Sequence, residues 1–122
     1  MEKKFEIKLL EEAFDFIKSQ NDKVQDKIFY NIRKAQILND PKLFKKLNQN
    51  IWEFRTKYAG LQYRILAFWD KDNNEMTLVC GTHGFVKKTD KVSPQEIEKA
   101  EQIRIEYLAN RQAGFESKKK KR

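Results

Sequence analysis

Two arginines, one histidine and a lysine pair are the side chains of this sequence that could do chemistry together. Arg55 and Arg64 flank an Ala-Gly pair, and the single histidine, His83, is followed by Lys87 and Lys88. A guanidinium presents a planar fork of N–H donors that fits phosphate oxygens. Histidine has the one side chain whose ordinary pKa suits proton transfer near neutral pH. These residue types predict an anion site.

The two arginines are predicted to face each other on a β-hairpin. Strands are expected over 51–57 and 62–69, and a symmetric loop at the Ala-Gly pair places Arg55 opposite Arg64. Like charges directly opposite each other destabilise a strand pair, so a bound anion would relieve this repulsion. Glu53 lies on the same face and diagonal to Arg64, so a purely structural charge triad is the alternative interpretation.

A third strand, expected over 76–85, is predicted to bring His83 to the same face of the sheet. With a symmetric turn in the DKDNNE segment, His83 lies diagonal to Arg64, and Gly81 leaves space opposite Arg64. Lys87 falls on the same face if the strand continues that far. The arrangement depends on register, because a slip of one residue moves every side chain to the other face.

The opposite face of these strands is predicted to be apolar and to lie against helices, because side chains alternate along a strand. The single cysteine, Cys80, belongs to this face and is interpreted as a buried structural thiol. It excludes an intramolecular disulfide. The predicted face comprises Trp52, Phe54, Tyr63, Ile65, Ala67, Trp69, Met76, Leu78 and Cys80.

The rest of the chain is predicted to be mainly helical. A short strand within 4–10 leads into a helical hairpin over 11–38, where apolar residues recur at helical spacing and Asn21 or Asp22 caps the second helix. Residues 41–50 are expected to form a short helical turn or loop. A last helix begins after Ser93 and ends near Gly114, with Ser93 and Glu96 forming a capping box.

Composition and charge favour one domain with a basic tail. The chain has 122 residues, of which 39% are hydrophobic, and a net charge of +8. The last five residues, 118–122, are all basic. We therefore expect a single domain over 1–113 and a flexible tail over 114–122. A basic balance favours polyanionic partners.

Several classes of protein are not expected from this sequence. No apolar run approaches a membrane span, and the N-terminus has no signal-peptide apolar region, so we expect a cytoplasmic protein without a membrane partner. There is no D-x-D, H-E-x-x-H or histidine cluster that would hold a metal. We expect metal-independent chemistry and no small-molecule cofactor.

Four segments carry a resemblance to a known family. They are WEFR (52–55), YRILAF (63–68), HGFVKKTDKVSP (83–94) and EIEKA (96–100). In this order and spacing, over about residues 3–110, they resemble the RelE/HigB superfamily of toxins from bacterial type II toxin–antitoxin systems. The nearest pattern is that of the phage-derived HigB-like branch. Phe54 stands where that pattern has leucine, and the lysine-rich tail lies outside it.

The resemblance implies a fold, an activity and partners. The implied fold is α+β and RelE-like, with an N-terminal helical hairpin and a C-terminal helix packed on a small twisted antiparallel sheet. The implied activity is that of an mRNA interferase, an endoribonuclease that acts on mRNA at the ribosome. The implied partner is a cognate antitoxin, typically a helix-turn-helix DNA-binding protein.

RNA supplies its own nucleophile, the 2′-OH, so the protein must align it and stabilise the charge on the scissile phosphate. Arg55 and Arg64 are candidates for that stabilisation, and His83 or Lys87 for proton transfer, with Lys88 gripping the backbone. A histidine at a strand end and a solvated lysine pair are equally ordinary structural features. Further candidate RNA-binding residues are Lys57, Lys91, Lys118, Lys119 and Lys120.

Two other functions fit the same pattern less well. A ParE-like toxin shares the fold but inhibits DNA gyrase, and the set of catalytic-looking residues argues against it. A non-catalytic nucleic-acid-binding module is a third possibility, but most of the tryptophans and tyrosines that could stack on bases fall on the apolar face. The basic tail is interpreted either as inert or as a non-specific contact to ribosomal RNA or the antitoxin.

Overall fold

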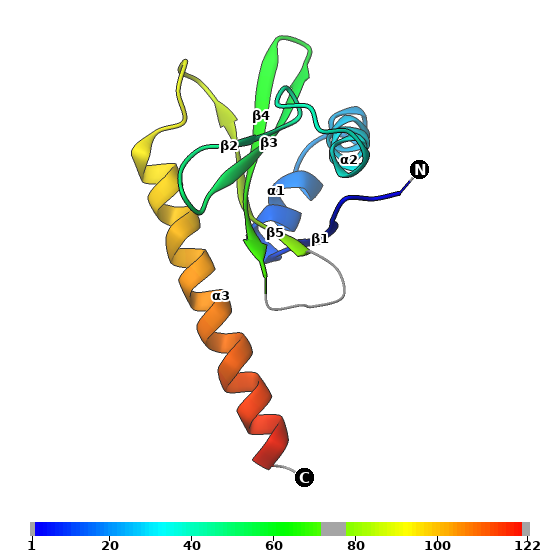
Figure 1. Ribbon diagram of the computed structural model, residues 1–122. Coiled ribbons are helices and arrows are strands. Elements are labelled where there is room, and N and C mark those ends of the chain that lie inside the picture. The colour runs from blue at the N-terminus through cyan, green and yellow to red at the C-terminus, as the bar shows by residue number, and fades with distance from the viewer. Residues whose placement is uncertain (1, 72–77, 121–122) are drawn as a thin grey trace.

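A five-stranded sheet in the order β1-β5-β4-β3-β2 is the frame of the molecule (Figure 1). The computed structural model describes residues 2–71 and 78–120, with side chains described as far as residue 110. β1 runs parallel to β5 and the other neighbours are antiparallel, so the sheet is mixed rather than antiparallel throughout. The strands are β1 (Glu6–Leu9), β2 (Phe44–Lys46), β3 (Trp52–Tyr58), β4 (Leu61–Asp70) and β5 (Leu78–Lys87).

Helices cover both faces of this sheet, which confirms the α+β class and its N-terminal helical hairpin. The hairpin, α1 (Glu11–Lys18) and α2 (Asp22–Ile37), packs on one face, and α3 (Pro94–Lys120) crosses the other. In Figure 1, α3 runs well beyond the sheet toward the C-terminus. Among the described residues, no helix combines the length and apolar character needed to cross a membrane.

The β3–β4 hairpin has the predicted register, with Arg55 opposite Arg64. Ala59 and Gly60 form its two-residue turn, and both have positive φ, at 52° and 81°. Such a turn matches the right-handed twist of the two strands, so it fixes their register. The alignment of the two arginines is therefore a consequence of the turn.

The β4–β5 pairing differs from the prediction. Arg64 lies opposite Phe85 rather than Gly81, and His83 lies opposite Leu66. The register shifts between Leu66 and Ala67, where Thr82 is the extra residue of a bulge on β5. The Thr82 hydroxyl donates to the Leu66 carbonyl oxygen at 3.2 Å. The prediction assumed a symmetric turn and uninterrupted pairing of the two strands, so it did not allow for this extra residue.

The bulge also changes which side chains share a face. Tyr63, Ile65 and Ala67 pack with the α1–α2 layer as predicted, together with Phe54. Leu78 and Cys80 were expected with them but lie on the opposite face, in a second cluster beneath α3. That cluster consists of Ile51, Leu66, Phe68, Cys80 and Ala100, with Leu78 packed against it. Cys80 is buried, and Met76 lies outside the described residues.

Three local predictions can be compared with the structure. Asn21 caps α2, because its side chain accepts a hydrogen bond from the Val24 amide at 3.0 Å. The prediction of a turn or loop over 41–50 missed β2, whose Phe44 stacks on Phe54 with ring centroids 4.3 Å apart. The predicted helix end at Gly114 was wrong, since α3 continues to Lys120.

Gly84 permits α1 to lie close against β5. A Cβ at this position would overlap the ring of Phe16 and lie 2.7 Å from Cδ1 of Ile65. At Gly81 a Cβ would meet the flexible end of Leu9 at 2.9 Å. The closer approach is thus at Gly84, directly under the first helix.

We expect Gly84→Ala to lower the free energy of unfolding by about 1–3 kcal/mol, because the ring of Phe16 has to move. Gly81→Ala is the matched control and is expected to cost less, since the end of Leu9 can rotate away. Denaturant titration of both variants measures the difference. Equal losses at the two positions would contradict this account of the packing.

Candidate functional site

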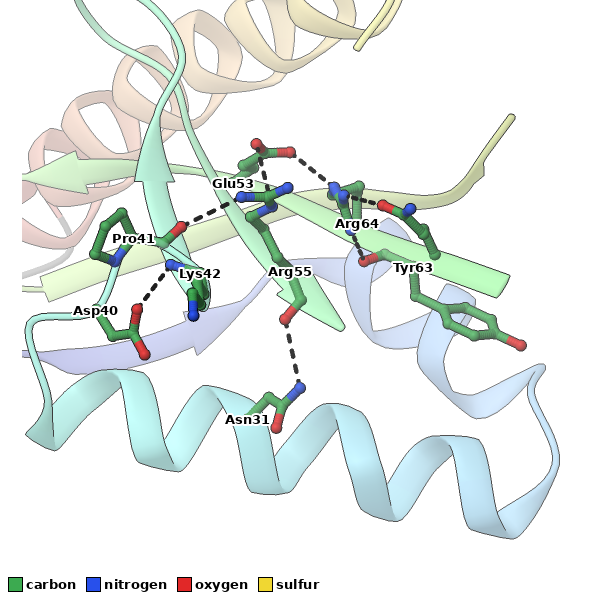
Figure 2. A network of polar contacts seen from close by, with 9 residues as sticks. Asn31, Asp40, Pro41, Lys42, Glu53, Arg55, Tyr63 and Arg64 are labelled. Atoms are coloured by element: carbon green, nitrogen blue, oxygen red, sulfur yellow. Dashed lines mark hydrogen bonds and ion pairs between the residues drawn. The ribbon is translucent and has the colours of Figure 1, made fainter. Parts of the chain in front are cut away.

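Glu53 lies between the two arginines and contacts both of them (Figure 2). Its Oε1 is 3.0 Å from Nε of Arg64, and its Oε2 is 3.8 Å from Nε of Arg55. The contact with Arg64 is the shorter of the two ion pairs, and both of its side chains are buried. Glu53 therefore offsets the repulsion of the arginine pair with the charge of its carboxylate.

Arg64 is buried on the central strand of the sheet, with 2% of its surface exposed. Besides Glu53, its guanidinium donates to the carbonyl oxygen of Tyr63 at 3.1 Å and to the side-chain oxygen of Gln62. Burial and the charge of Arg55 lower the pKa of Arg64, and Glu53 opposes that change. A guanidinium stays charged under such conditions, so Arg64 provides a fixed positive charge.

Arg55 is the more accessible arginine, and its hydrogen bonds connect β3 to the turn at 40–43 and to α2. Its Nη1 donates to the carbonyl oxygen of Pro41 at 3.4 Å, and its backbone amide donates to the carbonyl oxygen of Leu43 at 2.8 Å. The side-chain amide of Asn31 on α2 donates to the carbonyl oxygen of Arg55 at 3.4 Å (Figure 2). The turn at 40–43 and α2 thus position this residue from two sides.

A groove of about 460 Å³ lies beside the arginines, between α2, the turn at 40–43 and the hairpin end of β3 and β4. Among the described residues, ten line it, of which six are basic and none is acidic. The lining consists of Lys27, Asn31, Lys34, Lys42, Leu43, Arg55, Thr56, Lys57, Gln62 and Arg64. Such a lining focuses positive potential, so the groove can bind an anion.

Lys87 belongs to this part of the molecule and Lys88 lies at its margin. Lys87 is the last residue of β5, lies opposite Gln62 and is half-buried, whereas Lys88 is exposed beyond the strand. Burial, and then the charges of Arg64 and Arg55, lower the pKa of Lys87, while Glu53 opposes them. A lysine with a lowered pKa exchanges its proton more readily near neutral pH.

His83 is placed differently from the other candidates. It shares a face with Arg64, as predicted, but it is buried and is not among the residues that line the groove. Its Nε2 lies 3.0 Å from a carboxylate oxygen of Glu96 on α3, and its Nδ1 lies 3.1 Å from the hydroxyl of Thr82. In the neutral ring with its proton on Nε2, the Nε2–H group donates to the carboxylate. His83 therefore fastens β5 to the first turn of α3.

The same contact modifies the predicted capping box. The Ser93 hydroxyl accepts from the Glu96 amide at 3.4 Å, which is the expected half of the motif. The carboxylate of Glu96 turns to His83 instead, so the reciprocal half is replaced by a link to the sheet. Sequence pattern alone predicts the cap and misses the link, because the link joins residues of different elements.

The predicted RNA-binding lysines fall in three places. Lys57 lines the groove, and Lys91 is exposed in the segment between β5 and α3. Residues 118–120 lie at the far end of α3, remote from the β3–β4 turn (Figure 1), and their side chains are not described. The structure therefore brings only Lys57 of this set to the arginines.

The sequence did not lead us to three of the groove lysines, Lys27, Lys34 and Lys42. Lys27 and Lys34 lie on one face of α2 together with Asn31, because the three residues are spaced four and three apart. Lys42 comes from the turn before β2. The helical spacing was a usable signal, but nothing local to α2 indicates that this face borders the arginine pair.

Comparison with known families adds the evolutionary assignment. Residues 15–104 match the model of the family described as phage-derived protein Gp49-like (DUF891). The chain belongs to this family. The match spans most of the chain, from α1 to the middle of α3, and so includes both arginines, Glu53 and Lys87. The Gp49-like family is associated with the toxins of toxin–antitoxin systems. A comparison with curated proteins found no match.

Removing the negative charge between the arginines is expected to destabilise this Gp49-like domain. We predict that Glu53→Gln lowers the free energy of unfolding by about 3 kcal/mol or more, because the buried guanidinium of Arg64 then lies beside Arg55 without a compensating charge. Added phosphate should recover part of this loss by binding the folded state. Denaturant titration with and without phosphate measures both effects.

The matched control is Glu12→Gln, which breaks an exposed pair with Lys99 and is expected to cost less than about 1 kcal/mol. Phosphate should stabilise Glu53→Gln more than the wild type, whose arginines already have a carboxylate between them. Equal stability of the wild type and Glu53→Gln would refute the central role of this carboxylate.

The burial of His83 predicts a dependence of stability on pH. Burial lowers the pKa of His83 below its ordinary value of 6.5, while Glu96 opposes this change. The unfolded chain then binds a proton that the folded chain does not, so stability is full above about pH 6.5 and falls as the pH drops through 6.5 toward the folded pKa. The slope in this window is at most about 1.4 kcal/mol per pH unit.

His83→Gln should remove this part of the pH dependence, because glutamine does not titrate. Thermal unfolding of both proteins at several values between about pH 7.5 and 5 measures the difference. If the two proteins lose stability in parallel across this range, the neutral buried state of His83 is wrong.

Proposed function

We propose that this protein is a toxin that cleaves RNA without a metal ion, using the 2′-OH of the RNA as the nucleophile. The observation that carries the proposal is the groove with six basic and no acidic residues among its described lining, with the buried Arg64 at its inner end. A phosphodiester backbone is the anion that such an extended lining suits. Membership of the Gp49-like family supports a toxin in particular.

The chemistry divides between fixed charge and proton transfer. Arg55 and Arg64 bind the non-bridging oxygens of the scissile phosphate, where negative charge grows in the transition state. The 2′ oxygen attacks phosphorus and releases its proton to water, and the bond from phosphorus to the 5′ oxygen breaks. The products are a 2′,3′-cyclic phosphate and a 5′-hydroxyl. Lys87 gives the leaving oxygen its proton, which its lowered pKa favours.

His83 has no part in proton transfer in this proposal, because it is buried and bonded to Glu96 and Thr82. Lys57 and Lys88 hold the RNA backbone on either side of the reacting phosphate. Action on mRNA at the ribosome, and neutralisation by a cognate helix-turn-helix antitoxin, complete the proposal. These last two elements rest on the resemblance of the WEFR, YRILAF, HGFVKKTDKVSP and EIEKA segments to RelE/HigB toxins.

The proposal predicts that substitution of Lys87 or Arg55 slows RNA cleavage strongly without unfolding the protein. Lys87→Gln should slow cleavage by about 10²-fold or more, the usual value of a general acid. Arg55→Ala should also slow it strongly, because Arg55 stabilises charge in the transition state. The measurements are growth arrest on induction and mapping of new 5′ ends in cellular mRNA, with the melting temperature of each variant as the check on folding.

Lys71→Gln is the matched control, because Lys71 follows the opposite end of β4 from the groove and is exposed. It should leave cleavage unchanged. Full cleavage by both Lys87→Gln and Arg55→Ala would reject the assignment of the site. Growth arrest with intact mRNA and inhibited gyrase would instead place the protein with the ParE-like toxins.

A further inference from the structure

We propose that Tyr30 on α2 is a base-stacking site that extends the groove into a longer track for single-stranded RNA. The proposal rests on the proposed RNA cleavage for the identity of the polymer, and it assigns a binding role to a helix face outside the reacting centre. Its evidence is the exposure of Tyr30, the lysines beside its ring and the hollows that meet there.

Tyr30 is the most exposed large apolar side chain of the described residues, with 54% of its surface accessible. It lies near the middle of α2, and two lysines of the same helix approach its ring. Nζ of Lys27 is 5.4 Å from the ring centroid and Nζ of Lys34 is 5.9 Å from it. An aromatic ring flanked by cations offers a base its face and offers the adjoining phosphates their counter-charge.

Both lysines also line the basic groove, so the ring and the groove are continuous. Lys27 borders the groove and a neighbouring hollow of about 430 Å³ that includes Tyr30 and Tyr58. Lys34 borders the groove and a hollow of about 310 Å³ on the other side of Tyr30. Three hollows therefore meet along one face of α2, with Tyr30 lining two of them.

The charges around Tyr30 favour a polyanion. Besides Lys27 and Lys34, the two flanking hollows include Lys23 and Arg33, against a single acidic residue, Asp26. When a base stacks on the ring, one ammonium group can move from the ring face to the adjoining phosphate. The cation–π contact is then replaced by an ion pair with the RNA. Positive charge alone fits any polyanion, but an exposed ring between the charges fits a polymer with accessible planar bases.

Single-stranded RNA meets both requirements, because its bases are unpaired and available for stacking. A duplex hides its bases inside the helix and presents only phosphates. The same strand that places its scissile phosphate at Arg55 and Arg64 would continue past Lys27 and Lys34 to reach Tyr30. The platform thus gives the track affinity at a distance from the reacting bond.

The test measures binding apart from cleavage. A fluorescent 2′-O-methyl RNA strand of about 12 nucleotides has no free 2′-OH, so it binds without being cut, and anisotropy titration gives its affinity. Tyr30→Ala should weaken binding about tenfold, and Tyr30→Phe should bind within about twofold of the wild type because the ring is kept. An abasic strand of the same length should bind Tyr30→Ala and the wild type with equal affinity, because it has no base to stack on the ring.

The lysines are tested through salt dependence. Lys27→Gln and Lys34→Gln should each flatten the slope of log K against log salt by about 0.7, the value for one phosphate contact on a single strand. The controls are Lys71→Gln for charge and Phe14→Ala for an exposed ring, since Phe14 on α1 is 48% exposed and lines none of these hollows. Both controls should bind like the wild type.

Wild-type affinity of Tyr30→Ala, or an equal loss on abasic and normal strands, would overturn the stacking site. So would an equal loss on duplex RNA, because a duplex offers no base to the ring. The outcome is separable from that of the proposed function. A protein that cleaves mRNA but ignores Tyr30 retains the function and loses the platform, whereas Tyr30-dependent binding without cleavage retains the platform and loses the function.

Discussion

The ion triad of Glu53 with Arg55 and Arg64 is the interaction on which the rest of the site depends. Two positive charges lie opposite each other on adjacent strands, and the fold keeps them there because the two-residue turn leaves no other register. One buried carboxylate offsets them, and the turn at 40–43 and α2 secure Arg55. The triad thus maintains local positive charge in a folded protein, which an anion-binding site requires and a stable core disfavours.

The part of this arrangement that was predictable from sequence is the part governed by short-range rules. The β3–β4 register followed from the turn, and the Asn21 cap from its spacing to the helix. The β4–β5 register did not follow, because alternation of side chains carries no sign of where a bulge interrupts it. The lysines of α2 that line the groove were not predicted either, because α2 approaches the arginines only through tertiary packing.

Helices cover both faces of the sheet, so the groove and the proposed site lie at one end of it. Leu66 and Phe68 lie in the cluster beneath α3, whereas Arg64, two residues earlier in β4, lies at the groove. His83 lies near the boundary and belongs to the covered part, where it links β5 to Glu96 on α3. This explains why His83, whose ordinary pKa best suits proton transfer, has a structural role, while Lys87, nearer the open end, lies where burial and the charges of the two arginines lower its pKa.

The bulge at Thr82 reverses the alternation of side chains between the two faces of β5. Ahead of it, even-numbered residues of β5 face α3, as Cys80 does; after it, odd-numbered residues take that face, as His83 does. Without the extra residue, continued alternation would present Val86 toward the arginine face and send Lys87 toward α1. The extra residue in β5 therefore determines which lysine lies beside the proposed anion site, although Thr82 itself is not among the residues that line the groove.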